Sequence, residues 1–125
     1  MSITQDGIQT ALERNQLVDI TTMGRRSGQP RRLEIFMHNI GGRLYISGIP
    51  RPEKRSWLVN LESDPHLTLH LKEGIGVDLP ATARVIDEDE ERRAVLTDVA
   101  RTWQRHDLPT MVRMSPLIEV TVDRR

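Results

Sequence analysis

Six short segments of this 125-residue chain alternate apolar and polar residues, the pattern of a strand with one buried and one exposed face. The clearest segment covers residues 66–72, where three leucines face one side and two histidines and a threonine face the other. The others cover residues 18–22, 33–38, 44–47, 81–86 and 117–122. An Ile-Gly-Gly sequence at residues 40–42 predicts a hairpin between two of them. This pattern constrains the fold most, because all six strands must bury one face together.

Three other stretches have helical spacing. Residues 4–14 predict a short amphipathic helix, residues near 57–61 predict an inserted helix that ends before residue 65, and the acidic run at residues 87–91 begins a third helix that extends to about residue 103. Hairpin-length connections and one helix before the last strand favour a mainly β fold, a six-stranded antiparallel barrel with flanking short helices. An α/β sheet would need more crossover helices. We expect a single domain over residues 1–125, with residues 1–16 as a helical extension.

Four arginines lie within eight positions of the sequence TTMGRRSGQPRR at residues 21–32. The whole chain balances 18 Lys and Arg against 18 Asp and Glu, so no overall field attracts nucleic acid or an anionic membrane. A run of charged residues such as this most often lies on a solvent-exposed surface without binding a ligand. The alternative is an anion cradle on a strand-to-strand connection, because Gly24 and Gly28 allow a turn with exposed N–H groups. Arg25, Arg26 and Arg31 would add forked donors for phosphate or carboxylate.

Other kinds of chemistry lack their usual residues. The chain has no cysteine, which excludes disulfides and thiolate sites and is typical of a reducing cytoplasm. His66 and His70 share a strand face but lie about 13 Å apart, too far to bind one metal ion. The sequence contains no P-loop, G-x-G-x-x-G, HExxH or G-x-S-x-G pattern. A small barrel with an anion cradle and no such residues can still be an enzyme if a cofactor brings the reaction.

Two stretches resemble a known family: TTMGRRSGQPRRLEIFMHNIGGRLYISG at residues 21–48 and EKRSWLVNLESDPHLTLHLKEG at residues 53–74. They are similar to the deazaflavin-dependent nitroreductases, split-barrel oxidoreductases related to the pyridoxamine-phosphate-oxidase-like flavin-binding fold. Members typically carry a TTxGRKSGxxR-like turn, a GG hairpin and a WxxNLxxxP helix. The resemblance implies a six-stranded split β-barrel that binds 8-hydroxy-5-deazaflavin, coenzyme F(420). It also implies hydride transfer from the reduced coenzyme to a small electrophilic acceptor such as a quinone, an enone or a nitroaromatic.

The resemblance further implies a cofactor site. The residues expected to contact the phosphate and the acidic tail are Arg25, Arg26, Ser27, Gly28 and Arg31. Ser47 and Gly48 would approach the ring through backbone groups, and Trp57 and Asn60 would close the other side. Trp57 could equally be a residue of the hydrophobic core that makes no contact with the cofactor. No metal is expected.

The chain departs from the family pattern in two places. Members often have a lysine shortly after the serine that ends strand three, whereas residues 47–54 read SGIPRPEK, so Arg51 or Lys54 would supply that charge. The best-known nitro-reducing member has several tyrosines near its C-terminus, but Tyr45 is the only tyrosine here. Trp103 and His106 would therefore line the substrate pocket, with solvent or His106 as proton donor.

Other functions stay open on the sequence alone. The same barrel could hold a flavin, a deazaflavin, a tetrapyrrole or an acyl chain without turnover, and FMN is the alternative cofactor. A nucleic-acid binder could use the arginine turn, but the net charge is zero and aromatic residues make up only 3% of the chain. We expect a cytoplasmic protein with a small-molecule substrate, no nucleic-acid partner and no stable membrane insertion. A homodimer would agree with the common behaviour of split barrels.

Overall fold

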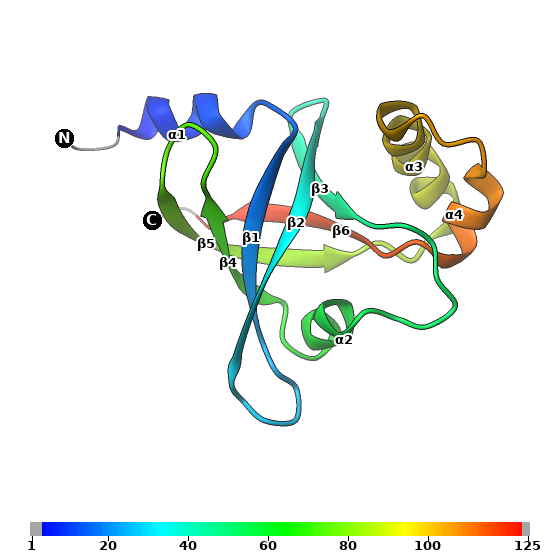
Figure 1. Ribbon diagram of the computed structural model, residues 1–125, viewed down its shortest axis with the longest axis horizontal. Helices are drawn as coiled ribbons and strands as arrows, with labels where there is room; N and C mark the ends of the chain where they lie inside the picture. Colours follow the sequence, from blue (N-terminus) through cyan, green and yellow to red (C-terminus); the bar gives the residue numbers. More distant parts are fainter. Residues whose placement is uncertain (1–3, 124–125) are drawn as a thin grey trace.

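Six antiparallel strands close into a barrel in the computed structural model, which describes residues 4–123 (Figure 1). The order around the barrel is β1-β2-β3-β6-β5-β4, and β4 pairs back to β1. The strands are β1 (Gln16–Met23), β2 (Pro30–Ile40), β3 (Arg43–Ser47), β4 (His66–Leu71), β5 (Val77–Val85) and β6 (Leu117–Val122). The helices are α1 (Gln5–Leu12), α2 (Ser56–Ser63), α3 (Asp89–Trp103) and α4 (Leu108–Met114). The predicted fold class is confirmed.

The predicted N-terminal helix is α1, which occupies residues 5–12. Thr4 caps it, because its side chain accepts a hydrogen bond from the N–H of Gly7 at 2.9 Å. Gln16, which we placed in the helical extension, already belongs to β1. Residues 1–3 of that extension lie outside the described residues.

The expected connection between β1 and β2 is shorter than the sequence suggested. β2 begins at Pro30. Proline is tolerated as the first residue of a strand, because its missing N–H then removes no hydrogen bond from the middle of the sheet. Arg31 and Arg32 therefore lie on the strand, opposite Thr22 and Thr21. The prediction that Arg31 sits on the connection together with Arg25 and Arg26 was wrong.

In the C-terminal half of the chain, β5 and α4 differ from the elements that the sequence predicted. β5 begins at Val77 and not near residue 81, because pairing with β4 carries the strand through Pro80. The helix α4 was missed altogether. It has seven residues, too few to show a period, and Pro109 in its first turn resembles a loop residue in the sequence.

The apolar sides of the six strands fill the barrel, with Val18, Ile20, Met37, Ile46 and Leu69 fully buried. Helices α1 and α2 lie at opposite ends of this barrel and add residues to its core (Figure 1). A second apolar cluster lies outside the barrel, between the helices α3 and α4 and residues of β3 and β6. Within residues 4–123, no helix combines the length and the apolar character needed to cross a membrane.

Candidate functional site

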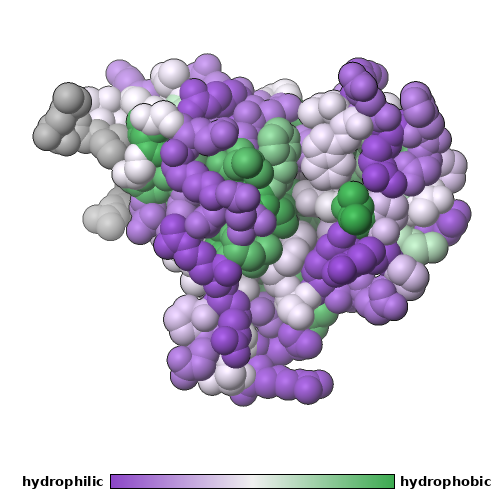
Figure 2. Space-filling view, in the orientation of Figure 1, coloured by the Kyte–Doolittle hydropathy of each residue, from purple (hydrophilic) through white to green (hydrophobic). Residues whose placement is uncertain are grey.

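A groove of about 500 Å³ lies between the β1–β2 connection and α2. Six of the nine predicted cofactor residues line it, namely Arg25, Arg26, Ser27, Arg31, Trp57 and Asn60. We call this the basic groove. Figure 2 shows that the β1–β2 connection projects from the barrel as a hydrophilic arm. The structure therefore brings together residues that are more than thirty positions apart in the sequence.

The arm keeps its shape through hydrogen bonds at two glycines. The N–H of Gly24 donates to the carbonyl of Gln29 at 2.9 Å, and the N–H of Gly28 donates to the carbonyl of Gly24 at 2.8 Å. Gly28 has a φ of 69°, a conformation that residues with a Cβ seldom adopt. At Gly24 a Cβ would come within 2.7 Å of the Ser27 hydroxyl. Both glycines are thus needed for a turn this tight.

Asn60 attaches the arm to α2. Its Oδ1 accepts from the backbone N–H of Arg25 at 3.2 Å and from Nη1 of Arg25 at 3.0 Å. Its Nδ2 donates to the hydroxyl of Thr22 at 3.1 Å, and the side chain is 3% exposed. These bonds use the amide on both sides, so Asn60 positions the arginine arm.

Three of the four arginines that line the basic groove have no acidic partner among the described residues. Within residues 4–123, Arg25, Arg26 and Arg31 form no ion pair, and Arg31 makes only a 3.5 Å contact with the Ser27 hydroxyl. Arg32 also lines the groove, but its Nε pairs with Asp19 at 2.9 Å. Hydrogen bonds from Lys72 and then Arg32 lower the pKa of Asp19. The groove therefore holds three cations that an anionic ligand could neutralise, whereas Arg32 is already paired.

The first turn of α2 adds to this positive character. Ser56 and Trp57 line the groove, and no side chain of the described residues caps the helix at Arg55. The N–H groups of an uncapped first turn carry partial positive charge and bind anions. Trp57 is 6% exposed and belongs to the barrel core, so it serves both as core residue and as groove wall.

Ser47 and Gly48, expected beside the ring, lie outside the lining of the basic groove. Ser47 is 2% exposed, and its hydroxyl donates to the carbonyl of Pro116 at 2.7 Å, which ties the end of β3 to the start of β6. A Cβ on Gly48 would approach Pro116 at 3.2 Å and the guanidinium of Arg55 at 3.3 Å. Gly48 thus allows Arg55 to pack closely against the backbone, a contact that no sequence period signals.

Trp103 and His106 are not brought to the basic groove. The ring of Trp103 packs against His38 at 5.0 Å and Phe36 at 6.3 Å on the outside of the barrel. His106 lines a different hollow at the α3–α4 connection. In Figure 1 this connection and the β1–β2 arm lie at distant ends of the molecule.

The other histidines form pairs with single carboxylates. His70 is 7% exposed and bonds to Asp78 and to the hydroxyl of Thr21, both at 2.7 Å, which ties three neighbouring strands together. His66 lies 2.9 Å from Asp64. In the part of the chain that the structure describes, no three His, Asp or Glu side chains come together as metal ligands would.

Solved structures define the class of the fold. A conserved hypothetical protein from Mycobacterium tuberculosis shares 19% identity, covering 99% of this chain and 83% of that chain, with a TM-score of 0.76. An FAD-binding protein from Mesorhizobium loti shares 12% identity, covering 97% and 91%, with a TM-score of 0.64. A structure described as an F(420)-H(2) dependent reductase shares 22% identity, covering 84% and 93%, with a TM-score of 0.59. At these identities the likeness shows the fold, a six-stranded split β-barrel.

The sequence itself identifies the family. The pattern of the F(420)H(2)-dependent quinone reductases matches residues 2–124, and the chain belongs to that family. It is an oxidoreductase that uses coenzyme F(420), as the resemblance of residues 21–74 predicted.

Proposed function

We propose that the basic groove binds coenzyme F(420) through its phosphate and acidic tail. The observation that supports this most is that Arg25, Arg26 and Arg31 line one groove without an acidic partner among the described residues. The uncapped first turn of α2 beside them adds N–H donors. This donor set fits an anionic cofactor tail, because forked guanidinium groups and free N–H groups are suited to phosphate and carboxylate oxygens.

The residues of the basic groove have different roles in binding the coenzyme. Arg26 and Arg31 supply charge, Asn60 holds Arg25 and the arm against α2, and Trp57 provides an apolar wall. When bound in its reduced form, the coenzyme supplies a hydride. The protein's part is to orient it toward the acceptor and to exclude water.

We propose a quinone as the acceptor, in accord with the family, with an enone or a nitroaromatic as the alternative. We assign no proton transfer to His106, because its hollow lies far from the basic groove. A homodimer and a cytoplasmic location stay predictions from the sequence.

The test is a titration of the protein with oxidised deazaflavin, followed in the visible spectrum. Arg26→Glu is the cleanest variant, because the Arg26 side chain bonds to no other described residue. Loss of one charge-assisted contact should raise the Kd roughly 10- to 150-fold. Arg93→Glu, on the exposed side of α3, is the matched control and should bind as the wild type does. Unchanged binding by Arg26→Glu and Arg31→Glu would refute the assignment of the groove.

A further inference from the structure

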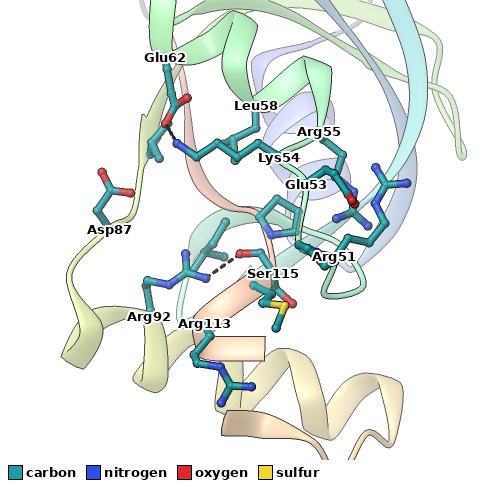
Figure 3. A pocket seen from close by; sticks show the side chains of 15 residues that line it. Arg51, Glu53, Lys54, Arg55, Leu58, Glu62, Asp87, Arg92, Arg113 and Ser115 are labelled. Carbon is teal, nitrogen blue, oxygen red and sulfur yellow. Dashed lines mark hydrogen bonds and ion pairs between the residues drawn. The ribbon is translucent and has the colours of Figure 1, made fainter. Parts of the chain in front are cut away.

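A second hollow, of about 200 Å³, lies on the opposite side of α2 from the basic groove. Trp57 and Asn60 face the basic groove, whereas Leu58 and Glu62 face this hollow, as the helical period requires. Its other walls come from the β3–α2 connection, from the junction between α4 and β6, and from the end of β5 and the start of α3 (Figure 3). We call it the α2–α4 hollow.

Arg51 and Arg55 lie next to each other at one edge of the α2–α4 hollow, as Figure 3 shows. Neither forms an ion pair within residues 4–123, although Glu53 is near them in the sequence. Burial, and next the charge of Arg51, lower the pKa of Arg55. Two neighbouring cations, one of them partly desolvated, therefore lie beside Glu53 without an ion-pair partner among the described residues.

The other charged side chains that line the hollow are Glu53, Lys54, Glu62, Asp87, Arg92 and Arg113, and three of them form hydrogen bonds or ion pairs. Lys54, one of the two residues expected to serve the cofactor, pairs with Glu62 at 2.9 Å. Arg92 donates to backbone carbonyls, including those of Val112 at 2.8 Å and Ile86 at 2.9 Å. Asp87 and Glu62 lie across the hollow from Arg51 and Arg55 in Figure 3. Two of the arginines without an ion pair among the described residues, Arg51 and Arg55, thus lie together at one edge of the hollow, and Arg113 lies at another.

The wall that faces these arginines is held in place. Arg92 binds the carbonyls of Met111, Val112 and Ser115 at the end of α4, and the N–H of Arg51 donates to the carbonyl of Met114 at 3.4 Å. The Arg92 bonds join α3 to the end of α4, and the Arg51 bond joins the β3–α2 connection to α4, before any ligand arrives. A site that needs little rearrangement loses less affinity to ordering.

We propose that the α2–α4 hollow is a second anion site, distinct from the coenzyme groove, which binds a single carboxylate or phosphate group through Arg51 and Arg55. Its size supports one small anionic group, because pockets for whole cofactors are larger, about 300–1,000 Å³. The group belongs either to the acceptor or to a free anion. The proposal goes beyond the proposed function, and it requires that Arg51, the other residue expected to serve the cofactor, does not contact the coenzyme tail.

The experiment measures amide chemical shifts of the full chain during titration with inorganic phosphate, and then with succinate. We expect saturable shifts at residues 51–55 and 113–117, which persist when oxidised deazaflavin is present at saturation. Arg51→Gln and Arg55→Gln should each weaken binding roughly tenfold or more, whereas Arg93→Gln should not change it. Melting curves of the variants show whether they are folded, and Arg51 is exposed, so its replacement should not disturb the core.

Two results would overturn the proposal. Absence of saturable shifts at these residues would show that no anion binds there, and loss of the shifts on adding deazaflavin would assign the hollow to the coenzyme. Because coenzyme binding is followed in the same sample, failure of this proposal is distinguishable from failure of the basic groove. Turnover of a carboxylated naphthoquinone and of menadione, measured with and without phosphate, then shows whether the anionic group belongs to the acceptor or is a free anion. If phosphate inhibits turnover of the carboxylated quinone but not of menadione, the anionic group in the hollow belongs to the acceptor. If phosphate inhibits neither reaction, the hollow binds a free anion.

Discussion

Acidification should destabilise this protein through His38, a β2 residue that lies between the barrel and α3. Its side chain is fully buried, and neither ring nitrogen has a hydrogen-bond partner within residues 4–123. Its nearest rings are Phe36 and Trp103, each with a centroid 5.0 Å away. Burial lowers the pKa of His38 from 6.5 to about 4, because nothing compensates the charge of an imidazolium in this place.

The direction of the effect follows from proton binding. In the unfolded chain His38 takes up a proton at its ordinary pKa, whereas in the folded protein it does so only near pH 4. The unfolded state therefore binds more protons as the pH falls through this window, and the free energy of unfolding decreases. At about 1.4 kcal/mol for each pKa unit, the loss amounts to about 3 kcal/mol when the window has been crossed.

Urea unfolding followed by circular dichroism at a series of pH values measures this loss. His38→Phe is the test variant, because it keeps an aromatic ring beside Trp103 and cannot be protonated. Carboxylates with lowered pKa values, such as Asp19 and Glu91, also lose their stabilising effect in acid, so the quantity of interest is the difference between the two proteins.

The advantage of His38→Phe over the wild type should grow by about 3 kcal/mol from about pH 7 to about pH 4. At neutral pH the variant should be as stable as the wild type or more so, because it removes two unpartnered polar atoms. The control His106→Gln, at an exposed histidine, should follow the wild-type curve. Parallel curves for wild type and His38→Phe would refute the reasoning.

Further predictions concern the groove and its supports. Asn60→Ala should lower the free energy of unfolding by about 1–3 kcal/mol and weaken deazaflavin binding, because its buried partners lose their bonds; binding without change would show that the arm does not depend on it. Trp57→Ala should destabilise the fold by about 3–5 kcal/mol in thermal melts, and a much smaller loss would place the ring outside the core. Arg92→Met should cost on the order of 3 kcal/mol, since several carbonyls at the end of α4 lose a charged donor; an unchanged melting temperature contradicts this. Deazaflavin should bind more tightly than FMN, by a margin that shrinks as ionic strength rises, and equal affinity for both would argue against the arginines as tail contacts.

Local patterns predicted most of the barrel. Alternation over residues 66–72 and the other five segments reflects the two-residue repeat of an extended chain, which needs no knowledge of distant residues. The Gly-Gly hairpin became the turn between β2 and β3, where both glycines have positive φ. The start of β5 and the helix α4 were missed because Pro80 and Pro109 resemble loop residues unless the partner strand or helix is known.

The sequence also indicated, through the family resemblance, that Arg25, Arg26, Ser27 and Arg31 belong with Trp57 and Asn60. It could not indicate that Asn60 uses its whole amide to hold Arg25 and Thr22, because these bonds join residues 35 and 38 positions apart.

What the sequence by itself determined is the set of strands and turns, the excess of arginine near residue 25 and the family. Only the tertiary structure decided which polar faces became covered. His38 and Thr68 both occupy the polar side of an alternating strand, yet α3 packs over His38 and buries it completely, while Thr68 stays half-buried. The same packing places Trp103 against Phe36, outside the basic groove. The course of the β3–α2 connection places Arg55 against Gly48. The physical reason is that alternation arises from the geometry of neighbouring residues, whereas burial depends on contacts between segments that meet only when the chain has folded.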